Sequence, residues 1–219
     1  MATTLAPEPK AIPIGGEQRV TLRGITWQGY QDILRALPNN RSSRLTFDNG
    51  VLEITVPLQV HEFSGRLIEL FIRILVVELG LKLKTMGSTT LNREDLNRGA
   101  EPDNAYYIQS YPKVIGKIID LAQDPPPDLI VEVDITNSDI DKNRLYASMG
   151  TPEFWRFDGD IWQILALRDS GYVEVSHSPT FNWIDKEDLY RFLEQARIDE
   201  VEAEIEFRAW VRVKRSDLN

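Results

Sequence analysis

The sequence predicts a mixed α/β (α+β) protein, in which amphipathic helices cover strands. Two observations support this class. Apolar residues recur at spacings of three and four over 26–37, 59–79 and 186–196, which is typical of helices that bury one face. Between these segments lie runs of alternating apolar and polar residues bounded by turn signals, which are typical of strands.

The first half of the chain contributes a helix, a hairpin and a long helix. Pro38 ends the helix at 26–37, because proline cannot continue a helical hydrogen-bond pattern. The pair Asn49-Gly50 predicts a hairpin over 44–57, since both central positions of a tight hairpin turn need positive φ. The long helix at 59–79 follows.

The second half is richer in strand patterns. A weak strand pattern at 81–91 and a polar, turn-rich stretch at 92–100 precede a strand at 101–108, whereas 113–121 suits either a strand or a helix. Further strands are predicted at 153–157, 161–167 and 172–177, the first two joined as a hairpin by Asp-Gly-Asp.

A strand at 129–135 is the most informative segment. Because side chains alternate across a strand, Leu129, Val131, Val133 and Ile135 share one face, and Ile130, Glu132 and Asp134 share the other. Two acids therefore occupy one face of a strand whose other residues are apolar and β-branched. Charged side chains are rarely buried unless they are paired or bind a cation, so this face is a candidate site.

A helix at 139–149 follows the strand. Ser138 and Asp141 form a capping-box pattern, and Gly150 suits the residue just after a helix. Lys142 shares a helical face with Tyr146, at a spacing of four residues. We therefore expect the ammonium group of Lys142 to point along the core toward the end of the strand.

Length and composition restrict the classes of protein and site. A chain of 219 residues fits one domain at 17–196, preceded by a flexible arm at 1–16 and followed by a tail or helix at 197–219. The absence of cysteine and the presence of only two histidines disfavour zinc, and leave Mg²⁺ or Mn²⁺ as the favoured ions.

Charge and hydropathy bear on partners and location. The net charge of −9 argues against broad adhesion to nucleic acid, although it leaves room for a local basic groove. The chain has no leader-like start and no apolar run of membrane-spanning length, so we expect a cytoplasmic protein with no membrane partner.

Asp103 and Glu132 are the pair that we place around one divalent cation. Mg²⁺ is usually held by one or two protein carboxylates, and the main-chain carbonyl of Val133 is the third expected protein oxygen. Such a cation activates water and stabilises an attacked phosphate, while Lys142 balances charge or positions the nucleophile. The reaction class is phosphodiester hydrolysis. Two acids of the sequence also have simpler, structural explanations. Asp103 is of the type that stabilises a turn, and Glu62, near the start of the helix at 59–79, is of the type that stabilises a helix N-terminus.

Three motifs carry a resemblance to a known family. Glu-Pro-Asp at 101–103, Pro-Asp-Leu-Ile-Val-Glu-Val at 127–133, and the run from Asp-Lys-Asn-Arg-Leu-Tyr to Glu-Phe-Trp at 141–155 resemble the Uma family of proposed restriction endonucleases, within the PD-(D/E)xK nuclease-like superfamily. The resemblance spans roughly residues 56–158. It implies a restriction-endonuclease-like mixed β-sheet flanked by helices, preceded by a helix and a hairpin.

The resemblance also implies roles for individual residues. Asp103 matches the motif aspartate, Glu132 the motif glutamate, and Lys142 a lysine that has moved onto the helix. The usual lysine position, two residues after the glutamate, holds Asp134, which is a further metal ligand, a source of like-charge repulsion, or a sign of drift from catalysis. Glu62 falls where a helix residue approaches the site, so we include it as an additional ligand candidate.

Three hypotheses remain open from the sequence. The first is a metal-dependent DNA endonuclease, for which a homodimer is favoured because two centres cut two strands and two-fold pairs are the commonest assemblies. The second is a non-catalytic binding or assembly module on the same fold. The third is a purely structural role, in which Asp103 caps a turn and Lys142 pairs with Glu132.

Overall fold

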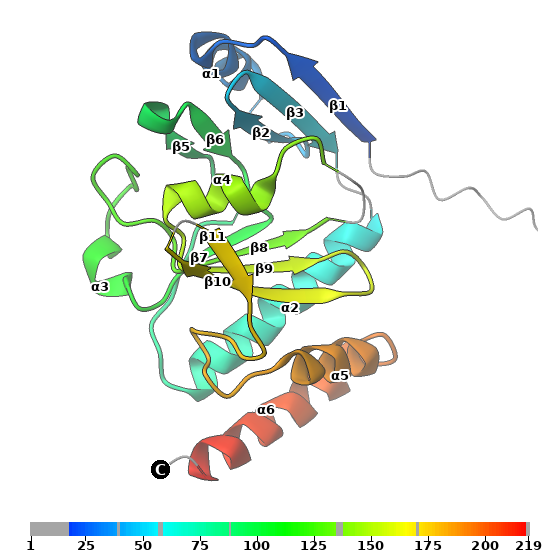
Figure 1. Ribbon diagram of the computed structural model, residues 1–219. Helices are drawn as coiled ribbons and strands as arrows, with labels where there is room; N and C mark the ends of the chain where they lie inside the picture. Colours follow the sequence, from blue (N-terminus) through cyan, green and yellow to red (C-terminus); the bar gives the residue numbers. More distant parts are fainter. Residues whose placement is uncertain are drawn as a thin grey trace, which may run out of the picture.

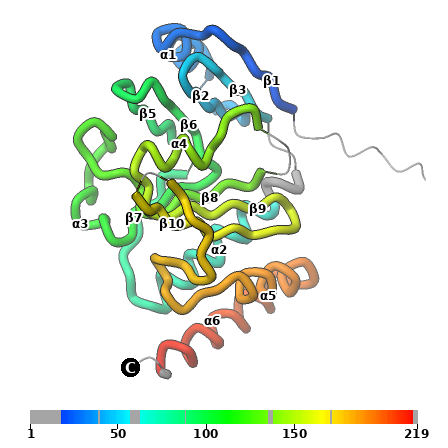
Figure 2. Tube along the Cα trace, in the orientation of Figure 1, coloured from blue at the N-terminus to red at the C-terminus, as the bar shows by residue number. Residues whose placement is uncertain are grey.

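The computed structural model describes residues 18–38, 40–56, 59–87, 89–134, 138–169 and 171–217, and leaves the side chains of 59–62 and 217 undescribed. The arm expected at 1–16 and the strand residue Ile135 lie outside the described residues. Figures 1 and 2 show two sheets with α4 between them, and a group of helices on the far side of the larger sheet.

The first sheet has the strand order β1-β3-β2-β6-β5, and all of its pairs are antiparallel. Its strands are β1 (Gln18–Arg23), β2 (Arg44–Asp48), β3 (Val51–Val56), β5 (Leu91–Arg93) and β6 (Arg98–Ala100). The predicted hairpin is confirmed, since Asn49 and Gly50 have φ of 46° and 93° between β2 and β3. Helix α1 (Trp27–Ala36) covers one face of this sheet through a small apolar cluster that includes Tyr30 and Phe47.

The second sheet has the order β11-β10-β9-β8-β7-β4. Its strands are β4 (Lys84–Thr85), β7 (Asn104–Tyr107), β8 (Leu129–Val133), β9 (Glu153–Phe157), β10 (Trp162–Arg168) and β11 (Gly171–Glu174). Strand β8 runs parallel to β9 and antiparallel to β7, so the sheet is mixed. The parallel pair is joined through α4 (Lys142–Met149), as parallel strands require a crossover connection.

Helices enclose the second sheet on one face and α4 covers the other. The helices α2 (Gln59–Glu78), α5 (Lys186–Ala196) and α6 (Glu200–Asp217) share one core cluster with alternate residues of β8. Phe207 of α6 stacks on Phe71 of α2 at a ring distance of 4.3 Å, so the segment expected as a tail or helix contains a helix that packs on the core.

Several local predictions were wrong, mainly where strands are short. The weak strand at 81–91 is only the two-residue β4 and the first residue of β5, and the turn-rich 92–100 contains β6 and the short 3₁₀ helix η1 (Glu94–Leu96). The stretch 113–121 contains only the end of the one-turn α3 (Tyr111–Val114), and the strand expected at 172–177 ends at Glu174. Segments this short bury too few residues to show a period.

The start of α4 also differs from its prediction. The helix begins at Lys142 rather than at 139, because Asp141 is the N-cap and its side chain accepts a hydrogen bond from the amide of Arg144. The hydroxyl of Ser138 does not cap the helix; it lies 2.8 Å from Oε2 of Glu53. Gly150, with φ of 83°, ends α4 as expected.

Candidate active site

The alternation of β8 directs Glu132 toward α4. Val131 and Val133 belong to the cluster shared with α2, whereas Ile130 packs in the cluster that contains Tyr146 of α4. Glu132 lies on the same face as Ile130 and is only 3% exposed. The strand therefore carries a carboxylate into a closed space between β8 and α4, as its pattern predicted.

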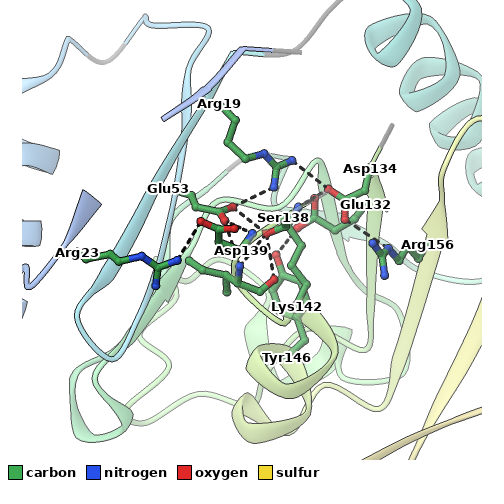
Figure 3. Close-up of polar contacts among 11 residues, drawn as sticks. Arg19, Arg23, Glu53, Glu132, Asp134, Ser138, Asp139, Lys142, Tyr146 and Arg156 are labelled. Atoms are coloured by element: carbon green, nitrogen blue, oxygen red, sulfur yellow. Dashed lines mark hydrogen bonds and ion pairs between the residues drawn. The ribbon is translucent and has the colours of Figure 1, made fainter. Parts of the chain in front are cut away.

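Two side chains of α4, one helical turn apart, hold Glu132 (Figure 3). Nζ of Lys142 lies 2.9 Å from Oε2 of Glu132, and the hydroxyl of Tyr146 donates to Oε1. Nζ of Lys142 also lies 2.7 Å from Oδ1 of Asp134, at the end of β8. The prediction that the ammonium group points toward the strand end is confirmed, and the ion pair expected under the structural hypothesis is present.

Burial and charge divide the protons of this cluster. Burial, reinforced by Asp134 and opposed by Lys142, raises the pKa of Glu132 above its ordinary value. Burial also acts to raise the pKa of Asp134, but Lys142, Arg156 and Arg19 together hold it below its ordinary value. Burial works against a charged Lys142, yet the two carboxylates hold its pKa above the usual range. Glu132 is therefore the carboxyl that takes up a proton first.

Asp103 lies immediately before β7, next to β8. The antiparallel register pairs Asn104 with Val131, which brings Asp103 alongside the end of β8 that carries Glu132. Oδ2 of Asp103 accepts a hydrogen bond of 2.6 Å from the amide of Val133, and the carboxylate also pairs with Arg44. The structure thus brings Asp103, Glu132 and Lys142 to the same end of the sheet.

The oxygen atoms at this strand end are of the type that hard divalent cations prefer. Oδ2 of Asp134 is buried with no hydrogen-bond partner in the described part of the chain, and its ion-pair contact is Arg156 Nε at 3.5 Å. Within the described ranges, no three His, Asp or Glu side chains form a ready metal cluster. A cation would therefore use two carboxylates together with main-chain and other oxygens, a donor set that suits Mg²⁺.

Two further metal ligands, Glu62 and the carbonyl oxygen of Val133, remain predictions. The side chain of Glu62 lies outside the described residues, so its place relative to the site is undescribed. Val133 contributes its amide to Asp103, and the role of its carbonyl oxygen as a ligand stays a prediction.

Glu53 on β3 is a residue of this region that the sequence analysis missed. It is 1% exposed and accepts hydrogen bonds from the amides of Asp139 and Ile140, at 2.5 Å and 3.0 Å, and from the hydroxyl of Ser138. Arg19 lies 2.9 Å from Glu53 and 3.8 Å from Asp134, which links the two carboxylates. The available signal was a charged residue between Leu52 and Ile54 in an apolar strand pattern.

The fold and the acid-lysine cluster together define the class of this protein. A mixed α+β architecture, in which a strand with an inward glutamate feeds a helix with an inward lysine, is a restriction-endonuclease-like fold. The chain belongs to the Uma2 family, whose description reads "Putative restriction endonuclease" and whose sequence pattern matches residues 27–205. This confirms the resemblance found in the sequence and suggests a nuclease.

The family match includes every residue of the candidate site from Asp103 to Lys142. A search of curated proteins gives no significant match. Among the described helices, none has both the length and the apolar composition that crossing a bilayer requires.

Proposed function

We propose that this protein is a divalent-metal-dependent endonuclease that hydrolyses DNA phosphodiester bonds. The observation that supports this best is the convergence of Asp103, Glu132 and Lys142 at one end of the second sheet, where the ammonium group of Lys142 is buried against Glu132. Perturbed ionisable groups of this kind cluster at functional sites. The family description points to the same class of reaction.

Each residue has a role that follows from its contacts. Asp103, Glu132 and the carbonyl of Val133 would hold Mg²⁺ or Mn²⁺, with Asp134 as a further ligand, and the cation would supply an activated water and charge stabilisation at the phosphate. Lys142 stays protonated, because two carboxylates raise its pKa, so it stabilises negative charge rather than removing protons.

Tyr146 is a positioning residue in this proposal. Burial, together with Glu132, raises the pKa of Tyr146 well above its ordinary value, so its hydroxyl keeps the proton that it donates to Glu132. The hydroxyl and the ammonium group engage different oxygens of Glu132, which fixes the plane of the carboxylate.

The decisive experiment is cleavage of plasmid DNA with Mg²⁺ or Mn²⁺ by the parent protein and by Glu132→Gln, Asp103→Asn and Lys142→Met. We expect each variant to lose roughly 10²-fold or more of the rate, because Glu132→Gln and Asp103→Asn remove ligands of the cation and Lys142→Met removes a positive charge that stabilises the reacting phosphate. Glu174→Gln is the matched control, since Glu174 pairs with Lys186 at the edge strand β11. Cleavage by a folded Glu132→Gln protein at the parent rate would disprove the assignment.

Metal binding gives an independent measurement. Calorimetry with Mn²⁺ should detect one site in the parent protein that is lost in Glu132→Gln, and anomalous scattering from Mn²⁺-soaked crystals should place the ion beside Asp103 and Glu132. Sedimentation should reveal a homodimer if two centres act on the two strands of a duplex.

One observation favours a second candidate, a non-catalytic binding or assembly module. The described carboxylates of the site already have cationic neighbours: Arg44 beside Asp103, Lys142 beside Glu132, and Arg156 beside Asp134. Charges balanced in this way need no metal. Absence of both cation binding and cleavage in a folded parent protein would support this candidate.

A further inference from the structure

Helix α6 packs on the core with one face and exposes the opposite face to solvent. Ala203, Phe207 and Val211, at a spacing of four residues, are buried in the cluster that α6 shares with α2 and α5. Figures 1 and 2 show α6, in red, at the end of the molecule opposite the first sheet. The outer face of α6 is therefore part of the molecular surface.

A row of four apolar residues runs along this outer face. Val201, Ile205 and Val213 are 68%, 56% and 62% exposed, and Ala209, between the last two, is exposed as well. Helix propensity does not explain valine and isoleucine at these positions, because β-branched residues form helices less readily than alanine, glutamate or lysine. Single exposed apolar residues are normal, whereas adjoining ones on one face are typical of an interaction surface.

Two rows of mainly charged residues flank the apolar row. On one side lie Glu200, Glu204, Arg208 and Arg212, and on the other lie Glu202, Glu206, Trp210 and Lys214. Each row begins with two glutamates and ends with a cationic residue. The helix dipole explains only part of this order, because its effect is confined to the first and last turns and the acids continue beyond the first turn.

The ends of the charged rows carry charges that a partner can reach. Arg208 binds both Glu204 and Glu78, so its charge is balanced within the molecule. Arg212 shares Glu78 with Arg208, yet its side chain stays 66% exposed. Lys214 is exposed and lies over an aromatic ring, a contact that does not neutralise its charge. The exposed surface of α6 is thus acidic at its start and basic at its end.

We propose that α6 pairs antiparallel with α6 of a second copy of this chain, about a two-fold axis near the middle of the apolar row. Such an axis sets each row against the same row of the second copy, running in the opposite direction. The glutamate ends then meet the cationic ends in both charged rows. Rows at a spacing of four residues are the ridges of the commonest class of helix packing, in which helices cross at roughly −50°.

The charges favour this partner and this orientation over the alternatives. A parallel pair would set glutamates against glutamates, and a membrane with anionic headgroups would be repelled by the four glutamates of the first half. The small side chain of Ala209, next to the axis, lets the two helices approach closely. The inference goes beyond the proposed function and does not depend on it, because α6 and Lys142 lie on opposite faces of the second sheet.

Sedimentation velocity over a range of protein concentrations, without DNA or divalent cations, tests the pairing. We expect the parent protein to dimerise, and Ile205→Lys to weaken dimerisation by roughly tenfold or more, since it places two like charges beside the axis. Ile118→Lys is the matched control, because Ile118 is 98% exposed and lies outside α6. A monomeric parent protein, or an Ile205→Lys protein that dimerises as well as the control, would overturn the proposal.

A charge exchange tests the orientation. Glu202→Lys and Lys214→Glu should each weaken the dimer, because each sets like charges against one another at both ends of the pair. An equimolar mixture of the two variants should dimerise again, since every lysine then meets a glutamate. A mixture that stays monomeric would refute the antiparallel arrangement.

The outcomes also separate this inference from the proposed endonuclease. A dimer that survives Ile205→Lys and both charge variants would use another surface, which refutes the role of α6 and leaves open a homodimer that cuts two strands. Cleavage of DNA by a monomeric parent protein would refute the α6 pair and leave the endonuclease proposal intact.

Discussion

Replacing Lys142 with methionine should strongly destabilise the protein. The lysine side chain is 11% exposed and its ammonium group lies 2.9 Å from Glu132 and 2.7 Å from Asp134. Removing it leaves two buried carboxylates close together, and breaking a buried pair in this way costs about 3–5 kcal/mol. For a chain of this size, that loss lowers Tm by roughly 6–20 °C.

The loss should depend on pH in a defined direction. Lys142 opposes the rise in the pKa of Glu132, so without it that pKa is expected to rise further above the unfolded value. A carboxyl whose folded pKa is raised gives stability that is present at low pH and is lost as pH rises through the folded pKa. The deficit of the variant should therefore be larger at about pH 8 than at about pH 5.

Urea unfolding followed by tryptophan fluorescence measures both effects. The control is Arg35→Met, because the side chains of Arg35 and of its partner Asp32 are 63% and 60% exposed, and exposed pairs contribute only about 0–1 kcal/mol. If Lys142→Met loses no more stability than this control, or loses the same amount at both pH values, the Lys142 pair is not the buried, coupled interaction described above.

Three further substitutions test other parts of the structure. Glu53→Ala should cost about 3–5 kcal/mol and speed hydrogen exchange at the amide of Ile140, because buried donors lose their acceptor; unchanged exchange would refute this. Glu153→Gln should flatten the pH dependence of stability: burial raises the pKa of Glu153, so this group stabilises most at low pH and loses that contribution as pH rises, and an unchanged urea-unfolding profile over pH would contradict this. Glu78→Ala should cost about 1–3 kcal/mol in urea unfolding, because Glu78 binds Arg208 and Arg212 and so joins α2 to α6; no loss would show that apolar packing alone holds α6.

The parts of the fold that the sequence predicted correctly have local physical causes. The Asn49-Gly50 turn depends on the φ preferences of two adjacent residues, and Gly150 ends α4 for the same kind of reason. The alternation along β8 and the spacing of Lys142 and Tyr146 on α4 are also local, so the inward direction of these side chains was predictable.

The parts that failed depend on partners distant in the chain. Strand β6 contains Arg98, Gly99 and Ala100, which show no alternating strand pattern in the sequence. These residues adopt a strand conformation because they pair with β2 on one side and β5 on the other. Glu53 was missed for a similar reason, since its acceptor role is defined by the amide of Asp139, 86 residues further along. The start of α4 was mispredicted for the same reason. The hydroxyl of Ser138 binds Glu53 on β3 instead of capping the helix, and Asp141 is the N-cap.

Strand β8 is buried along its whole length, with odd-numbered residues against α2 and even-numbered residues against α4. Inserting or deleting a single amino acid inside β8 would exchange the two environments. Glu132 would then point into the apolar cluster beside α2, and a valine would lie against the ammonium group of Lys142. The register of these five residues thus decides whether Glu132 faces Lys142. An insertion or deletion of two residues restores the alternation and should be tolerated better than an insertion or deletion of one.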